Sequence, residues 1–262
     1  MARQDLPTII DHVLATTGKE KLTYIGHSEG TTQFFLGASL MPEYFTDRVN
    51  LFVGLAPVAS TANIPTPYLR KIAEHINEFE IAVVAAKFYN MFPPMYRAIA
   101  LQEFFCTLPY IEEACMHIGS FLHNEAVDDP AIAETFLSHE PSGQSYRTFI
   151  YYGQQMATGK VALYDYGKRH NEKIYGSEEP PLVPYENFNV PSGLFSGSLD
   201  DLASPTDVAW TKEQIGDNVV FAQEYLMDHF SFVMAKDMTY FTRDVVNLVQ
   251  QYNPSSLDAI VQ

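Results

Sequence analysis

The stretch KLTYIGHSEGTTQFFLGASL, residues 21–40, decides the fold. Its first five residues form a β-branched and aromatic run that predicts a buried strand. The sequence Gly26-His27-Ser28-Glu29-Gly30 follows at once, and residues 31–40 are predicted to form a helix. A second apolar run, VNLFVGLAPV at 49–58, predicts the next strand. A strand, a helix and a strand in this order predict a right-handed parallel crossover, and therefore an α/β fold.

The same alternation returns near the C-terminus. Strands are predicted at 190–196 and 219–226, with a helix at 207–215 between them and a long amphipathic helix at 232–251 after them. Between the N-terminal and the C-terminal α/β stretches, prolines are frequent and no alternation of strands and helices is visible. The chain is therefore predicted to divide into an α/β core at 1–60, an inserted, mainly helical subdomain at 61–187, and the rest of the core at 188–262.

The composition limits the function classes. Hydrophobic residues make up 47% of the 262 residues, which is enough for a packed core and excludes wholesale disorder. The formal net charge of −16 makes binding to nucleic acid, or to anionic lipid by electrostatics alone, unfavourable. Protonation of the 8 histidines would reduce this charge, which suits an acidic secretory or lysosomal compartment.

Other sequence signals are weak. No apolar run is long enough for a transmembrane helix, and the first residues lack the order of a signal peptide. The sequence has no HExxH, CxxC pair, GxxxxGK[ST] or GxGxxG, so neither a metal site nor an organic cofactor is predicted.

The chemistry is expected at the G-x-S-x-G pattern. It lies between a predicted strand and a predicted helix, which is the position of a nucleophile elbow. There the Ser28 hydroxyl would project beside a helix N-terminus, and Gly26 and Gly30 would remove side chains that clash in the turn. The alternative is an ordinary glycine-rich turn.

A serine nucleophile needs a base and an acid, in the chain order Ser, Asp, His. Asp200 follows the predicted strand 190–196, and His229 follows the predicted strand 219–226, so both lie where α/β sheets place their sites. On its own, His229 could equally be a packing residue. The rival acids are Asp201, Asp207, which more plausibly begins a helix, and Asp228.

Several blocks resemble the acid lipase family, the gastric and lysosomal acid lipases and their invertebrate relatives, which have the α/β-hydrolase fold. These blocks occur in the family's order over nearly the whole chain. They are DLPTIIDHVLATTGKEKLTYIGHSEGTT (5–32), LAPVA (55–59), LSHEPSG (137–143), ALYDYG (162–167), GSLDDLASPTDV (197–208) and DHFSF (228–232).

The resemblance implies roles for individual residues. Ser28 would be the nucleophile, Asp200 the acid and His229 the base, with the backbone N–H of Glu29 as an oxyanion donor. It also implies a disulfide between Cys106 and Cys115, a cap and lid over a lipid pocket, triacylglycerol or cholesteryl ester substrates at a lipid–water interface, and a secreted or lysosomal location. The alternatives are a carboxylesterase for small esters and a non-catalytic lipid-binding remnant.

Two departures from the family stand out. The family usually has Gln directly after the nucleophile, where this chain has Glu29. The family's chain also begins well upstream, with a signal peptide, several strands and a His-Gly loop that supplies a further oxyanion donor. We therefore expect a partial α/β-hydrolase core without those strands, as in a fragment or an incomplete gene model.

Overall fold

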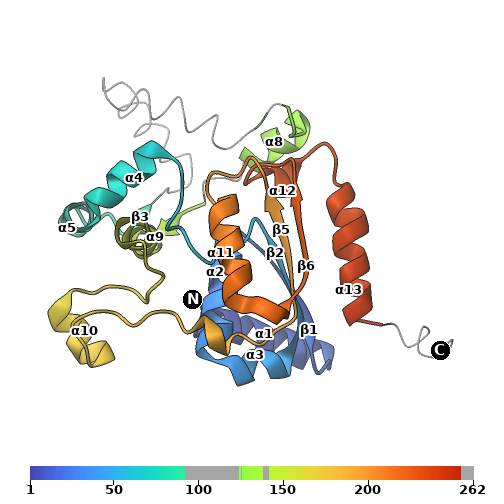
Figure 1. Cartoon of the computed structure of the whole chain (residues 1–262), viewed down its shortest axis with the longest axis horizontal. Helices are drawn as coiled ribbons and strands as arrows, with labels where there is room; N and C mark the ends of the chain where they lie inside the picture. The colour runs from blue at the N-terminus through green and yellow to red at the C-terminus, as the bar shows by residue number, and fades with distance from the viewer. Residues whose placement is uncertain (92–123, 125, 138–141, 255–262) are drawn as a thin grey trace.

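The computed structural model describes residues 1–91, 124, 126–137 and 142–254. Within them, the centre of the molecule is a four-stranded sheet in the order β1-β2-β5-β6 (Figure 1). All three strand pairings are parallel. These strands are β1 (Leu22–His27), β2 (Val49–Leu55), β5 (Ser192–Gly197) and β6 (Val219–Tyr225). The predicted α/β fold is therefore confirmed.

Helices cover the sheet and form a separate layer beside it (Figure 1). Those next to the sheet are α1 (Asp5–Thr17), α2 (Glu29–Leu40), α3 (Pro42–Arg48), α11 (Pro205–Ile215), α12 (Ser231–Met234) and α13 (Val246–Tyr252). Those of the predicted insertion (61–187) are α4 (Pro67–Glu74), α5 (Ile76–Ala85), α8 (Pro130–Leu137), α9 (Tyr146–Thr158) and α10 (Lys168–Tyr175), of which α8 lies next to α12 rather than in the layer beside the sheet.

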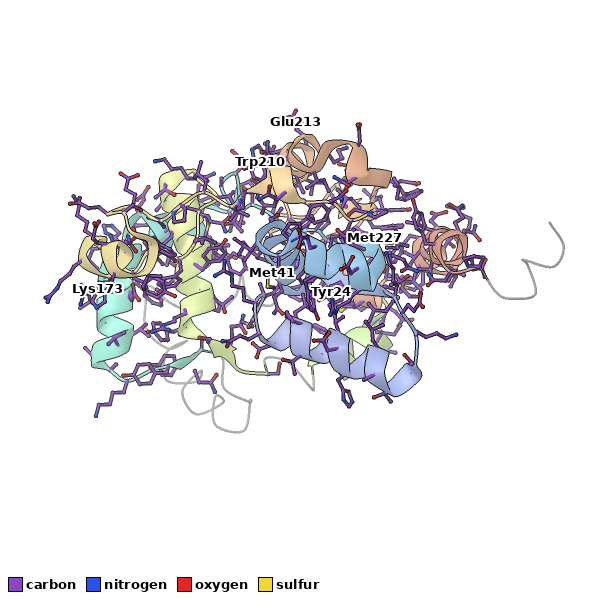
Figure 2. The ribbon with its side chains drawn as sticks, turned by 90° about the horizontal axis from the view of Figure 1, so that it is seen from below. Tyr24, Met41, Lys173, Trp210, Glu213 and Met227 are labelled. Carbon is purple, nitrogen blue, oxygen red and sulfur yellow. The ribbon has the colours of Figure 1, made fainter. Side chains whose placement is uncertain are left out.

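The core lies on both faces of the sheet, because successive strand residues point to opposite sides. Phe52 of β2 packs in the cluster that also holds Phe34 of α2, with the two rings stacked at 4.2 Å. The neighbouring Val53 packs in the opposite cluster, together with Leu248 of α13. Figure 2, seen from below, labels Trp210 of α11, which packs at the edge of the first cluster. Because both faces of the sheet are covered, every residue of β5 and all residues of β2 except Asn50 are buried.

The helices of the predicted insertion are organised around α9, which contacts both α4 and α5. Its Gly153 faces α5 so closely that a β-carbon there would lie 2.3 Å from the side chain of Ile76. A short antiparallel pair, β3 (Asn90–Met91) with β4 (Gln144–Ser145), adds a small second sheet that the sequence did not predict. The division of the chain into core and insertion stays a prediction. In Figure 1, α4, α5, α9 and α10 lie to one side of the sheet, whereas α8 lies next to α12.

The prediction of one helix at 232–251 is wrong. The chain forms α12, then leaves the helical path at Ala235, and re-enters as a π-helix (Tyr240–Val245) that continues into α13. The carboxylate of Asp237 accepts a hydrogen bond from the backbone N–H of Thr239, and this local turn competes with a continuous helix. The backbone between the two helices also bonds outside the helical path, because the N–H of Lys236 donates to the carbonyl of Val127.

Candidate active site

Ser28 lies at a tight turn between β1 and α2. Its backbone has a φ of 54° and a ψ of −118°, an unfavourable region for a residue with a side chain. A β-carbon on Gly26 would lie 3.0 Å from the carbonyl carbon of Gly30 and 2.8 Å from the Tyr24 ring, so only glycine fits there. At Gly30 itself, a β-carbon would meet only the Tyr24 hydroxyl, at 3.4 Å. Both glycines were expected to be required to avoid clashes in the turn, but the structure leaves much less room for a side chain at Gly26 than at Gly30.

His229 lies in the loop between β6 and α12 and is only 4% exposed. The Ser28 hydroxyl oxygen is 2.5 Å from its Nε2. Local hydrogen bonds fix the backbone around His229. The carboxylate of Asp228, the residue before it, accepts hydrogen bonds from the N–H groups of Phe230 and Ser231, the two residues after it. The carboxylate of the predicted rival acid Asp228 is therefore used to order the loop just before α12.

Asp200 lies in the loop after β5 and is 1% exposed. Its two carboxylate oxygens are 2.9 and 3.1 Å from Nδ1 of His229. The backbone N–H groups of Leu202 and Ala203 both donate to Oδ1, at 2.8 Å. The N–H donors of Leu202, Ala203 and His229 together fix the orientation of this buried carboxylate. The structure thus brings Ser28, His229 and Asp200 together in one continuous chain of hydrogen bonds.

The two other rival acids do not reach His229. Asp201 is exposed. Asp207 is buried in the first turn of α11, where its carboxylate accepts hydrogen bonds from Ser60, Asn63 and Ser204. Asp207 therefore ties the end of the loop that carries Asp200 to the segment after β2, a contact that the sequence did not reveal.

Glu29 is the first residue of α2, so its backbone N–H lies at the helix N-terminus. Its carboxylate accepts hydrogen bonds from the side-chain amides of Gln33, one turn along α2, and Gln144 of β4. Glu29 thus joins the elbow to β4, which lies in the predicted insertion. No local sequence pattern links positions 29 and 144.

Sequence reasoning also missed His27, although it occupies the first variable position of the G-x-S-x-G pattern. Its Nε2 lies 2.7 Å from the carbonyl oxygen of His229, and the two imidazole rings are 5.1 Å apart. Burial lowers the pKa of His27 to about 4, and the nearby ring of His229 acts in the same direction. A neutral His27 donates its Nε2–H to that carbonyl.

Some predictions fall outside this site. Cys106 and Cys115 lie outside the described residues, as does part of the block 137–143. Among the residues that the structure covers, no group of three or more His, Cys, Asp or Glu side chains is arranged to hold a metal ion. In the same part of the chain, no helix is long and apolar enough to cross a membrane.

Comparison with known proteins adds three curated relatives. The putative lysosomal acid lipase/cholesteryl ester hydrolase of Crotalus adamanteus is 29% identical over 255 residues, 96% of this chain and 63% of that protein. The lysosomal acid lipase/cholesteryl ester hydrolase of Homo sapiens is 29% identical, with the same coverage. Gastric triacylglycerol lipase of Rattus norvegicus is 29% identical over 90% of this chain and 60% of that protein. The chain thus spans less than two thirds of the length of these relatives.

Solved structures identify the fold. A monoacylglycerol lipase of Paleococcus ferrophilus superposes with a TM-score of 0.54 at 14% identity, covering 94% of this chain and 74% of that one. A carboxylesterase structure from the thaumarchaeon Nitrososphaera gargenis gives a TM-score of 0.50 at 16% identity, covering 96% and 75%. No protein-family model matches the chain. The predicted α/β-hydrolase fold is confirmed by these neighbours.

Proposed function

We propose that this homologue of the gastric and lysosomal acid lipases is itself a serine ester hydrolase that acts on neutral lipids such as triacylglycerols or cholesteryl esters. The observation that carries the proposal is the chain of hydrogen bonds from Ser28 through His229 to Asp200. It joins residues 201 positions apart in the sequence. A nucleophile, a base and an orienting acid in these contacts are what acyl transfer requires.

The reaction follows from the positions of these groups. His229 Nε2 takes the proton of the Ser28 hydroxyl as its oxygen attacks the ester carbonyl. Asp200 holds the Nδ1–H tautomer and stabilises the imidazolium that forms. The negative charge that develops on the carbonyl oxygen is stabilised at the N-terminus of α2, where the backbone N–H of Glu29 is the donor. His229 then protonates the leaving alcohol, and water hydrolyses the acyl-enzyme.

Apolar surface in the predicted insertion supports a lipid substrate. Helices α4 and α5 and the turn after them expose large apolar side chains, the most accessible being Ile81, at 70%. The others are Ile72, Val84, Phe88 and Tyr89. Exposed apolar side chains that gather in one region are typical of surfaces that contact lipid or ligand. With a net charge of −16, contact with a lipid–water interface would depend on these side chains rather than on attraction to anionic lipid. A secreted or lysosomal location belongs to the same proposal.

Two substrates distinguish the candidate functions. Wild-type protein is incubated with emulsified triolein and with the water-soluble ester p-nitrophenyl butyrate, beside Ser28→Ala as the control. Release of oleic acid by the wild type only, with a loss on the order of 10⁶ in the variant, supports the lipase. Cleavage of the soluble ester alone would indicate a small-ester carboxylesterase. A folded protein that cleaves neither would be the non-catalytic remnant.

A further inference from the structure

His27 and Ser28 are consecutive residues that both bind His229. The Ser28 hydroxyl is 2.5 Å from the imidazole Nε2, and the His27 Nε2 is 2.7 Å from the backbone carbonyl oxygen of the same residue. One contact reaches the side chain of His229 and the other its main chain. The end of a single strand therefore fixes the base at two points.

The strand that carries this pair is firmly placed. His27 is the last residue of β1 and is paired with Leu55 of β2. The N–H of Ser28 continues the ladder by donating to the carbonyl of Leu55, at 3.1 Å. The loop of His229, by contrast, connects β6, at the opposite edge of the sheet, to α12. The His27 side chain thus ties that loop directly to the strand of the nucleophile.

We infer that His27 is a positioning residue for the reaction proposed above: by donating Nε2–H to the carbonyl oxygen of His229, it holds the imidazole between Ser28 and Asp200. The inference rests on the proposed function, since it assigns His27 a role only through the base. The hydrogen bond of His27 reaches the main chain of His229 and not the imidazole nitrogens that react. Its contribution is geometric, because a displacement of about 1 Å between reacting groups typically lowers turnover on the order of 10²-fold.

The charge state of His27 suits this role. Its low pKa keeps the ring neutral at neutral and mildly acidic pH, so one ring nitrogen carries the proton. The hydrogen bond to a carbonyl oxygen selects the Nε2–H tautomer, since a carbonyl only accepts. A neutral ring also places no second positive charge beside the imidazolium that forms on His229, 5.1 Å away between ring centres.

The test compares two replacements of His27 in the full chain. His27→Phe keeps an aromatic ring but removes the donor, whereas His27→Gln keeps an N–H donor at similar reach. We expect kcat to fall about 10- to 100-fold in His27→Phe with KM unchanged, and His27→Gln to recover to within about fivefold of wild type. His170→Gln, on an exposed face of α10, is the matched control and should leave both constants unchanged.

Each result bears on the inference. A His27→Phe variant with wild-type kcat would overturn it, as would a folded His27→Gln variant no better than His27→Phe. If the variants do not fold, long-range ¹H–¹⁵N NMR of the wild type decides, because the inference requires a protonated Nε2 on His27 at pH 7 and a protonated Nδ1 would overturn it. A wild type that neither hydrolyses esters nor reacts with a fluorophosphonate would instead contradict the proposed function.

Discussion

The loop that carries Asp200 and the loop that carries His229 meet at Gly197 and Met227. A β-carbon on Gly197 would lie 2.3 Å from the carbonyl oxygen of Met227, well inside contact distance. The same carbonyl accepts a hydrogen bond from the N–H of Leu199, at 3.0 Å. The acid and the base are therefore positioned by direct backbone contact between their loops, and glycine at position 197 permits it.

Gly197→Ala is expected to separate these two loops. The methyl group must displace backbone atoms, so we expect a loss of about 1–3 kcal/mol in unfolding free energy and a fall of at least tenfold in kcat. Gly159→Ala is the control, because that glycine has a φ of 67° with no atom within 4 Å of the added carbon. It should cost about 1 kcal/mol of backbone strain and leave kcat unchanged. Equal kcat in the two variants would contradict the close contact.

Two variants, Asp200→Asn and Asp201→Asn, show which of the two neighbouring aspartates acts as the acid. An amide at position 200 no longer stabilises the protonated imidazole and can favour the wrong tautomer, so kcat should fall on the order of 10⁴-fold. Asp201 is exposed, and its replacement should change kcat by less than about twofold. Steady-state kinetics on p-nitrophenyl butyrate measure both. The opposite ranking would assign the acid to Asp201.

The contact between Glu29 and Gln144 predicts energetic coupling. A hydrogen bond from an amide to a partly buried carboxylate contributes more than one between neutral groups, and we expect a coupling free energy of about 1–2 kcal/mol. A double-mutant cycle of Glu29→Ala and Gln144→Ala, followed by urea unfolding, measures it. Gln33→Ala serves as a comparison, because the Gln33 amide lies 3.4 Å from the same carboxylate and should couple more weakly. Additive effects of Glu29→Ala and Gln144→Ala would show that the two side chains do not interact.

The lowered pKa of His27 predicts how the free energy of unfolding depends on pH. Its pKa is about 4 in the folded chain and about 6.5 when unfolded, so between these values the unfolded chain binds a proton that the folded chain does not. Stability therefore rises with pH across this range, and acidification from pH 7 to pH 4 should remove up to about 3 kcal/mol through His27 alone. His27→Gln should flatten this part of the profile in urea unfolding measured at several pH values. Parallel profiles for the two proteins would contradict a depressed pKa.

The sequence was sufficient for the sheet and for the three residues of the proposed triad. The strands are short runs rich in apolar residues and bounded by turn residues, so β1, β2, β5 and β6 were visible without any long-range information. Their burial was less predictable: β1, expected to be buried, is an edge strand that is mostly half-buried, and β6 at the other edge is largely exposed. Because the carboxyl ends of parallel strands lie at one edge of the sheet, the loops after three of them were expected to meet. His229 and four aspartates were the candidates at those points, and the family resemblance implied Asp200 rather than Asp201, Asp207 or Asp228.

What the sequence did not predict depends on partners distant in the chain or on a local competition. Positions 29 and 144 meet through tertiary packing, and no periodicity links them. The contact of His27 with His229 likewise joins residues 202 apart. The break between α12 and the π-helix has a local cause, because the turn at Asp237 interrupts a stretch that was predicted to be one continuous helix.

The central claim is that Ser28 is an activated nucleophile, and covalent labelling tests it most directly. The folded wild-type chain is treated with a fluorophosphonate at pH 7, digested and analysed by mass spectrometry, beside His229→Ala and Ser28→Ala. We expect one phosphonyl adduct, on the peptide that contains Ser28, with labelling at least 10³-fold slower in His229→Ala and absent in Ser28→Ala. A cooperatively folded wild-type protein that carries no adduct on Ser28, or that is labelled equally fast without His229, would contradict the account.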